Sequence, residues 1–339
     1  MSEPVRLGVL GAANIARKVV IPSITRAAGV ELVAIASGSD KAAEFLSTTE
    51  LTSSDGRPLR ETVRACTYDE LIGAEDVDAV YIPLPNHLHA PWSMRAADAG
   101  KHVLCEKPAA RTRSEAAAAI DHCVARDVVW MEAFMYRFHP QWQVVFEGLE
   151  AGRIGALRHV RSLFTFTVSS PENVRRRPEA GGGSLYDVGY YCVNAARWTV
   201  GGEPVAVAAT MTLGPEGVDE EFAAVLDFGA SRSATIVSSF TQPYRHEVEV
   251  LGTGGRIRIP TAFVNGPEPL TVEFEDASGA TEAVSVPGDD EYRLEVEDFA
   301  RCIREGRQPT VVSHADTLAN MAAIDALYEA ARSGLRVEL

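Results

Sequence analysis

Short apolar runs rich in β-branched residues alternate with amphipathic helical segments from residue 5 to about residue 129. Fully apolar runs of this length are typical of parallel strands that are buried on both faces. We therefore predict a doubly wound α/β domain over residues 1–129, with six strand candidates. The pattern gives bounds for five of them: 5–10, 31–36, 78–82, 102–105 and 127–132.

The pattern changes after residue 130. A helix is predicted over residues 138–150, and segments with a period of two residues follow at 157–168, 205–213, 221–228, 234–240, 246–251 and 256–259, with shorter ones to about 286. Two helices, over 292–305 and 313–332, close the chain. This indicates a second domain of the α+β class over residues 130–339, with the last helix expected to pack back on the first domain.

Composition excludes several classes of function. The net charge of -15 disfavours binding to nucleic acid or to anionic membranes, and no compact Lys/Arg stripe offsets it. The five cysteines have no paired spacing, which argues against a zinc or disulfide framework. No apolar run has membrane-spanning length and no signal peptide is recognisable, so we expect a soluble, cytoplasmic protein.

The first predicted strand runs into a glycine turn and then a helix. The turn matches the dinucleotide fingerprint G-x-G-x-x-G/A, in which the helix N-terminus faces a pyrophosphate. Ala13 replaces the second glycine of that pattern. The cofactor-binding candidates here are Gly11, Ala12, Ala13, Asn14 and Ile15.

The residue that ends the second strand usually selects the cofactor, because an acid there binds the ribose and repels a 2′-phosphate. This chain has no acid at that point, and Ser37, Gly38, Ser39 and Lys41 suit a phosphate instead. We therefore predict NADP, with NAD as the alternative. Asp40 leaves two interpretations open, the N-cap of the next helix or a contact with the ribose.

Polar residues also follow the fourth and fifth strands, at the sheet edge where ligands bind in open α/β folds. An ionisable lysine at this edge is a candidate for chemistry, although a solvated Glu–Lys pair is the alternative. The pair His87 and His89 makes a poor metal site without a third ligand, and no metal is predicted. The cofactor-binding candidates at this edge are Pro83, Leu84, Asn86, His89, Glu106 and Lys107.

A helix bracketed by glycines carries Asp187, Tyr191 and Asn194 on one face, at spacings i, i+4 and i+7. Such a stripe is common on a solvent-facing helix. The preceding triple glycine and the aromatic surroundings make a cleft-facing position at least as plausible.

Five segments of the chain resemble the glucose-fructose oxidoreductase, inositol 2-dehydrogenase and rhizopine-catabolism (Gfo/Idh/MocA) family. They are the turn at 11–16, PNHLH at 85–89, EKP at 106–108, GGGSLYDVGYY at 181–191 and YRLEVEDFARCIREGRQP at 292–309. Tyr191, with MEAFMYRFHPQ at 131–141, is similar to the branch of NADP-linked xylose dehydrogenases, dihydrodiol dehydrogenases and glucose-fructose oxidoreductase. Ala13 and Gly38 depart from the family pattern.

The resemblance implies a Rossmann domain followed by a domain with an open, mainly antiparallel sheet that forms a homodimer or homotetramer. It implies that Lys107 is catalytic, that the Lys107–Pro108 peptide is cis, and that Asp187 and Tyr191 bind substrate and handle its proton. Tyr136, Arg137, Asn194 and the arginines at 175–177, Arg176 among them, are further candidates to line the pocket. For the arginines, a solvated loop is the alternative.

The leading hypothesis is an NADP-preferring aldose 1-dehydrogenase, for instance of D-xylose. The alternatives within the family are a keto-sugar reductase and a dihydrodiol dehydrogenase. Two alternatives belong to other classes of function. A nicotinamide-dependent glycosidase would show no net cofactor turnover. A non-catalytic NAD(P)-binding regulator would keep its biological effect in a Lys107→Ala variant.

Overall fold

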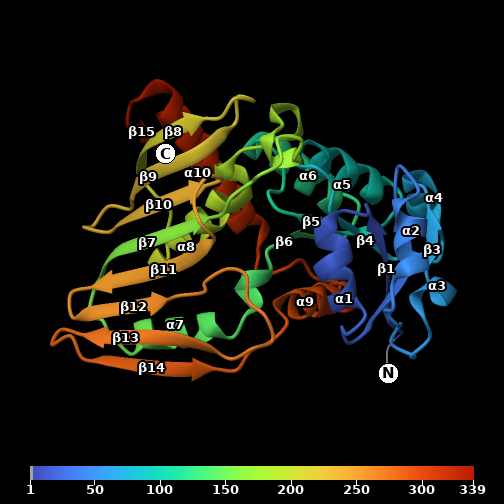
Figure 1. The fold of residues 1–339 in the computed structure, drawn as a ribbon, viewed down its shortest axis with the longest axis horizontal. Coiled ribbons are helices and arrows are strands. Elements are labelled where there is room, and N and C mark those ends of the chain that lie inside the picture. Colours follow the sequence, from blue (N-terminus) through green and yellow to red (C-terminus); the bar gives the residue numbers. More distant parts are fainter. Residues whose placement is uncertain (1–2) are drawn as a thin grey trace. The chain divides into compact units, whose positions relative to one another are not determined.

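The computed structural model describes residues 3–339, which divide into two compact units. The first unit runs through Phe138 and takes up Asp290–Thr317, and the second comprises His139–Asp289 and Leu318–Leu339. The segment that returns to the first unit is therefore helix α9 (Glu291–Glu305), whereas α10 (His314–Ser333) belongs to the second unit from Leu318 onward. In Figure 1, α9 lies beside α1 (Ile21–Ile24), far from it in sequence.

The first unit is built on a six-stranded sheet in the order β3-β2-β1-β4-β5-β6, with every pair parallel. This confirms the predicted doubly wound sheet. The strands are β1 (Val5–Leu10), β2 (Val30–Ala36), β3 (Arg64–Cys66), β4 (Ala79–Ile82), β5 (His102–Glu106) and β6 (Trp130–Ala133). The other helices are η1 (Ala16–Val20), α2 (Lys41–Thr48), α3 (Leu59–Thr62), α4 (Tyr68–Gly73), η2 (Asn86–Leu88), α5 (His89–Asp98), α6 (Arg113–Val124) and η3 (Met135–Phe138).

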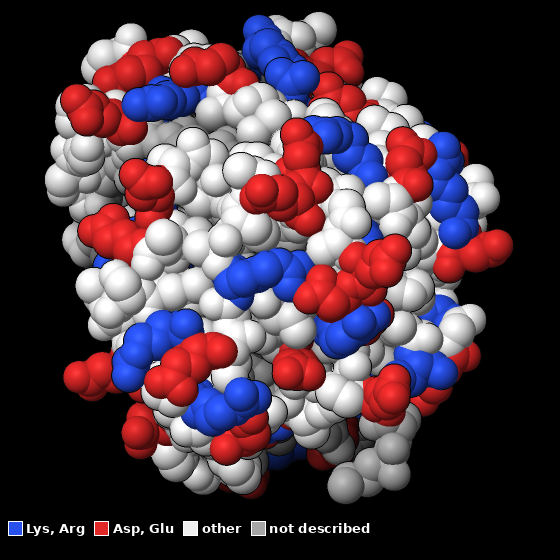
Figure 2. All heavy atoms as spheres, turned by 90° about the vertical axis from the view of Figure 1, so that its right-hand side faces the viewer, with Lys and Arg blue, Asp and Glu red and all other residues white. Residues whose placement is uncertain are grey.

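Acidic and basic side chains are interspersed on the face drawn in Figure 2, rather than gathered into a patch of one sign. Arginines pair with neighbouring carboxylates, as Arg95 does with Asp69 and Arg126 does with Asp98. Within residues 3–339, no helix is both long and apolar enough to span a bilayer.

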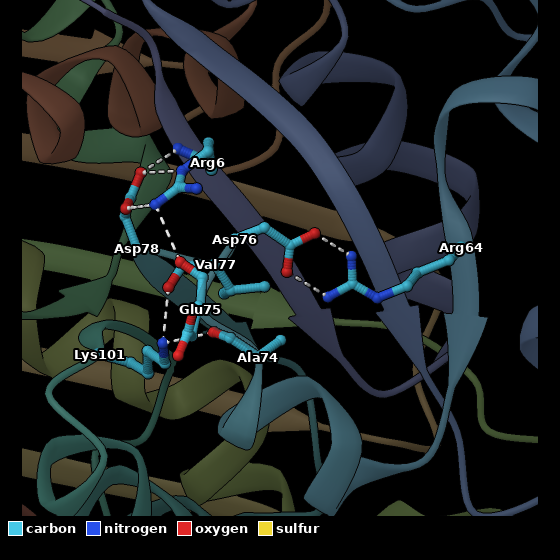
Figure 3. Close-up of polar contacts among 8 residues, drawn as sticks. All are labelled: Arg6, Arg64, Ala74, Glu75, Asp76, Val77, Asp78 and Lys101. Atoms are coloured by element: carbon cyan, nitrogen blue, oxygen red, sulfur yellow. Dashed lines mark hydrogen bonds and ion pairs between the residues drawn. The ribbon is translucent and has the colours of Figure 1, made fainter.

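A polar cluster joins the amino ends of the strands, at the edge opposite the fingerprint (Figure 3). Arg6 donates through Nη2 to Asp78 Oδ1 at 2.6 Å and through Nε to Oδ2 at 3.0 Å. The side chain of Lys101 is buried, and its ammonium donates to the carbonyl oxygens of Ala74 and Val77 at 2.7 and 2.8 Å. These bonds fix the loop that leads into β4.

Helix α9 carries acidic residues on its buried side. The apolar period of the helix places residues such as Leu294 and Phe299 on this side, and Glu291, Glu295 and Asp298 are also buried there, at 0%, 2% and 3% exposure. Their spacing of i, i+4 and i+7 places them on one face of the helix. The apolar pattern therefore did not reveal the whole contact face.

The second unit is built on a nine-stranded mixed sheet in the order β14-β13-β12-β11-β7-β10-β9-β8-β15. Only β7 and β10 pair in parallel among these described strands, so the sheet is mainly antiparallel, as expected. The strands are β7 (Leu157–Thr165), β8 (Ala206–Leu213), β9 (Asp219–Asp227), β10 (Ser233–Ser239), β11 (Arg245–Gly252), β12 (Gly255–Ile259), β13 (Leu270–Asp276), β14 (Thr281–Val286) and β15 (Val337–Glu338).

Helices α7 (Gln141–Glu150) and α8 (Tyr190–Val200) pack on this sheet and meet through aromatic rings. The Trp198 ring lies 5.1 Å from that of Trp142 and 4.6 Å from that of Phe146. Side chains that alternate with buried ones along the strands stay exposed, as Val225 and Leu213 do at 49% and 54%. Three short turns, η4 (Val174–Arg176), η5 (Pro178–Ala180) and η6 (Leu185–Gly189), precede α8.

Candidate active site

The fingerprint turn lies against the loop that follows β4. Gly11 has φ of +140°, and a Cβ at this position would lie 3.1 Å from the side chain of Leu84. A glycine is needed here both for the backbone angle and for this close approach. Ala13 and Asn14 are not buried, so the turn presents backbone at the carboxyl edge of the sheet. This arrangement fits the pyrophosphate of a dinucleotide.

The loop after β2 presents two hydroxyls and one ammonium. Ser37 is buried and its Oγ accepts from the backbone N–H of Ser39 at 3.2 Å, whereas Ser39 and Lys41 are exposed. Asp40 takes the N-cap position of α2 without a side-chain capping bond. The exposed donors in this loop suit a phosphate better than they suit a free ribose diol.

Lys107 follows β5 and is half-buried, and its peptide bond with Pro108 is cis. The preceding carboxylate is held from two sides. Tyr81, which is fully buried on β4, donates to Glu106 Oε1 at 2.6 Å, and Glu106 Oε2 accepts from the backbone N–H of Lys107 at 3.2 Å. The Glu106 carboxylate therefore connects the backbone N–H of Lys107 to Tyr81 on the neighbouring strand β4.

His89 lies between two loops. The residue is 1% exposed, with ring Nδ1 2.7 Å from the carbonyl oxygen of Pro108 and Nε2 2.7 Å from that of Leu84. Burial lowers the pKa of His89 to about 4. The structure thus gives this imidazole a place between the loops, and its contact with the cofactor stays a prediction. Asn86 and Pro83 lie in the loop that His89 supports.

Glu132 supports the same segment from β6. Its side chain is buried, with Oε1 accepting from the backbone N–H of Ala109 at 2.8 Å and Oε2 accepting from Thr317 Oγ1 at 2.9 Å. The sequence analysis named neither Tyr81 nor Glu132. The signal that pointed to Glu106, a charged residue near the carboxyl end of a buried strand, also applied to Glu132.

Helix α9 adds an acid near this loop. Burial and the nearby charge of Glu106 raise the pKa of Glu295 well above its usual range, although a backbone N–H from Phe134 favours the ionised form. Burial near Glu106 therefore disfavours the ionised form of Glu295.

Tyr136 and Arg137 are built into the first unit. Tyr136 is fully buried, and its ring packs edge-on against that of Phe134. Arg137 Nη1 lies 2.9 Å from Asp316 Oδ2, and its Nη2 donates to the carbonyl oxygen of Val311 at 2.8 Å. Both side chains therefore pack within the first unit, and their place in a sugar pocket stays a prediction.

In the second unit, Asp187 lies in the π-helical turn η6, and Tyr191 and Asn194 lie in α8. The turn interrupts the single regular helix that the spacing predicted. Tyr191 and Asn194 are 6% and 1% exposed, which excludes a solvent-facing stripe. The Tyr191 ring packs against Phe164 and Phe263, with centroids 5.6 and 5.5 Å away.

A buried carboxylate anchors the start of this segment. Asp219 Oδ2 accepts from Ser184 Oγ at 2.9 Å and from the backbone N–H of Leu185 at 2.8 Å, while Oδ1 accepts from the Tyr328 hydroxyl at 2.8 Å. Burial nevertheless raises the pKa of Asp219. Sequence reasoning missed this residue, because its donors come from segments far away in the chain.

Arg176 is neutralised inside the second unit. Its side chain is 15% exposed, with Nη1 2.7 Å from Glu220 and 3.5 Å from Glu216, and Nη2 donates to the carbonyl oxygen of Val168 at 2.9 Å. This arrangement does not support the expected contact of Arg176 with substrate. It is the preceding residue, Arg175, that reaches Asp187, with Nε 2.5 Å from Oδ2.

Two family models match this chain. Residues 5–134 match the model of the oxidoreductase family NAD-binding Rossmann fold, and residues 142–258 match that of the GFO/IDH/MocA C-terminal domain. The chain belongs to the Gfo/Idh/MocA oxidoreductase family. This confirms the family predicted from the motifs, and it makes the chain an NAD(P)-dependent oxidoreductase.

Three similar proteins show that the family match extends over the whole chain. A D-xylose 1-dehydrogenase (NADP(+)) of Haloferax volcanii is 39% identical, covering 98% of this chain and 99% of that protein. A dTDP-3,4-didehydro-2,6-dideoxy-alpha-D-glucose 3-reductase of Saccharopolyspora spinosa is 33% identical, with coverage of 98% and 99%. The crystal structure of a 3-ketoreductase from Actinomadura kijaniata with NADP and TDP-benzene has a TM-score of 0.90 at 30% identity, with coverage of 97% and 98%.

Proposed function

We propose that this Gfo/Idh/MocA protein is an NADP-preferring sugar dehydrogenase that oxidises an aldose such as D-xylose at C1. The observation that carries the proposal is the rigid loop after β5. Glu106 is held by Tyr81, Pro108 lies against His89, and Ala109 is bonded to Glu132. A half-buried lysine is thereby presented at the edge of the sheet that carries the fingerprint turn.

Oxidation of a sugar CH–OH group removes one hydride and one proton. When bound, the nicotinamide takes up the hydride, and the protein has to orient the sugar and move the proton. Lys107 is the proposed proton acceptor. Tyr191 hydrogen-bonds the reacting oxygen, and Asp187 and Asn194 accept from or donate to the neighbouring hydroxyls. Asp187 is an acceptor when ionised, which suits a polyhydroxyl ligand.

The choice of NADP rests on the loop after β2. Ser39 and Lys41 are exposed there, and an ammonium and a hydroxyl favour the 2′-phosphate. A Lys41→Ala variant is expected to raise the KM for NADP several-fold and to leave that for NAD nearly unchanged. Equal changes for the two cofactors would place Lys41 outside the phosphate site.

The test of the function is reduction of NADP and NAD, followed at 340 nm, with a panel of aldoses, polyols and dihydrodiols. A Lys107→Ala variant should lose roughly 10²–10⁴-fold in kcat with a pentose while it still binds NADPH. Lys18→Met serves as the matched control, because Lys18 is an exposed lysine of the same unit. A Lys107→Ala variant with undiminished kcat would refute the role of this lysine.

Keto-sugar reduction is the second candidate, favoured by the similarity to the two sugar 3-ketoreductases. It predicts NADPH oxidation with a dTDP-linked 3-keto sugar and no NADP reduction with free aldoses. A glycosidase would release sugar without net change at 340 nm, and a regulator would bind NADPH without turnover of any substrate in the panel.

We also propose a homodimer or homotetramer assembled through the nine-stranded sheet. Exposed apolar residues on its strands, Leu213 on β8 and Val225 on β9, support this. A Val225→Lys variant should lower the mass measured by light scattering after gel filtration. An unchanged mass would exclude this part of the sheet as the interface.

A further inference from the structure

Three consecutive arginines precede the triple glycine, and each has a different environment. Arg177 is exposed, Arg176 is paired with Glu220, and Arg175 is 41% exposed with Nε 2.5 Å from Asp187 Oδ2. The Arg175 guanidinium also lies 5.7 Å from the centre of the Phe166 ring. The pair brings together the turn η4 and the turn η6, twelve residues apart.

The triple glycine fixes this pair by allowing two backbone segments to touch. Gly183 and Gly182 donate through their N–H groups to the carbonyl oxygens of Arg175 and Arg177, both at 2.9 Å. A Cβ at position 182 would lie 2.4 Å from the Arg175 oxygen, and one at position 183 would lie 2.2 Å from Asp219 Oδ1. A larger residue at position 182 would push the backbone of Arg175 away, and one at position 183 would push Asp219 away, so both glycines are needed for this arrangement.

We propose that Arg175 is a positioning residue, which holds the Asp187 carboxylate ionised and in one orientation at the start of the helix that carries Tyr191. The inference rests on the proposed sugar dehydrogenase function, in which Asp187 accepts hydrogen bonds from substrate hydroxyls. An Arg–carboxylate contact of this kind is a charge-assisted hydrogen bond, which is stronger and more directional than a neutral one. The Asp187 side chain is only 16% exposed, so solvent screens the pair weakly.

Several charged and titratable groups of the elements around η6 have partners of their own. Strands β7, β9 and β10 and helix α8 pack against the turn. From β9, Asp219 is bonded to Ser184 and Tyr328, and Glu220 is paired with Arg176. From α8, Tyr191 packs against aromatic rings. Arg175 is in direct contact with Asp187, so its removal acts directly on that carboxylate.

This arrangement assigns different tasks to the two polar residues of the segment. An ionised Asp187 has two acceptor oxygens and no proton to give, so it selects substrates by their hydroxyl donors. In the proposed function, Tyr191 and Lys107 act on a different oxygen, the hydroxyl oxygen of the carbon that loses the hydride. Arg175 thus contributes to the binding of sugar hydroxyls without touching the sugar.

The kinetic test compares Arg175→Ala with Arg158→Ala. Both variants remove one positive charge from the second unit, but only the first removes a guanidinium that contacts Asp187, because Arg158 is an exposed residue of β7. We expect Arg175→Ala to lose roughly 10- to 100-fold in kcat/KM for the sugar, with the KM for NADP unchanged, and Arg158→Ala to stay close to the parent. Added methylguanidinium should restore part of the activity of Arg175→Ala and leave Arg158→Ala unaffected. Equal losses in both variants, or loss without rescue, would overturn the proposal.

A second measurement does not depend on activity. Selective ¹³Cγ labelling of aspartate in the full chain, with Asp187→Asn for assignment, gives the pKa of Asp187 by NMR. Removing the guanidinium should raise the pKa of Asp187 in Arg175→Ala, with Arg175→Lys in between and Arg158→Ala equal to the parent. An unchanged pKa in both Arg175 variants would refute the pairing. If the pKa rises but no sugar is turned over by the parent, the proposed function fails and the pairing stands.

Discussion

The His89 imidazole lies 2.7 Å from the carbonyl oxygen of Pro108, the residue that follows the proposed catalytic lysine. The second ring nitrogen is equally close to Leu84, which packs on the fingerprint turn. Since burial lowers the pKa of His89 to about 4, the ring is neutral at pH 7 and its single N–H donates to one of these two carbonyl oxygens at a time. The buried ring packs between the proposed cofactor loop and the lysine loop and contacts both.

Replacing His89 with Phe should affect catalysis more than folding. Phenylalanine fills the space but offers no N–H, so the loop with Pro108 can move, and we expect a loss of roughly tenfold or more in kcat. Steady-state kinetics with the best sugar measures it. His122→Phe is the control, because His122 is paired with Asp98 elsewhere in the same unit. Parental kcat in His89→Phe would mean that the link does not position Lys107.

Asp219→Asn should lower both stability and turnover. Both oxygens of Asp219 accept hydrogen bonds, from Ser184, Leu185 and Tyr328. Asparagine replaces one oxygen with an NH₂ group that faces these donors. A buried donor left without an acceptor costs about 1–3 kcal/mol. Urea unfolding measures this cost, and sugar kinetics measures the displacement of η6.

Tyr328→Phe is the graded comparison for this anchor, since it removes one donor and leaves Asp219 ionisable. It should lose about 1 kcal/mol of unfolding free energy and keep most of the activity. NADPH affinity should be unchanged in both variants. If Tyr328→Phe lost as much turnover as Asp219→Asn, the carboxylate would not be the group that matters.

Buried histidines should make stability depend on pH. Burial lowers the pKa of His246 from 6.5 to about 4. Between these pH values the ring is protonated in the unfolded state and neutral in the folded state. The stability from this group is complete above pH 6.5 and is lost as the pH falls toward 4. His246 Nδ1 accepts from the backbone N–H of Phe263 at 3.1 Å, a bond that asparagine can mimic.

His246→Asn should therefore flatten the pH dependence of unfolding between pH 6.5 and 4 by up to about one proton. Urea unfolding at a series of pH values measures the slope. His314, which is part-buried and bonded to the carbonyl oxygen of Trp130, is left in place in both proteins. A slope identical to that of the parent would show that His246 has the same pKa in the folded and unfolded states.

Lys101→Met tests the cluster at the opposite edge of the sheet. Methionine keeps the apolar part of the side chain but leaves the carbonyl oxygens of Ala74 and Val77 without the ammonium, so we expect a loss of about 1–3 kcal/mol in unfolding free energy. The exposed Lys18→Met is the control and should unfold like the parent. kcat should be unchanged in Lys101→Met, because this edge is remote from the fingerprint. A stability equal to that of the control would show that water replaces the ammonium.

Much of the fold could be predicted because hydrophobic period and glycine position are local properties. The bounds of β1 match the predicted 5–10, and α9 (Glu291–Glu305) nearly matches the predicted 292–305, with the left-handed Gly306 directly after it. The three-residue β3 was not delimited, since so short a strand has no readable period. The fingerprint turn and the EKP loop were found for the same reason, that their spacing along the chain carries the signal.

Tertiary structure alone decided which polar residues face one another. Sequence placed three arginines beside a triple glycine, but only the fold shows that Arg175 reaches Asp187 while Arg176 is taken up by Glu220. It likewise placed the His89 ring between two loops, and it buried Glu295 near the charge of Glu106. Side-chain partners depend on contacts between residues far apart in the chain, and such contacts leave no periodic trace in a single sequence.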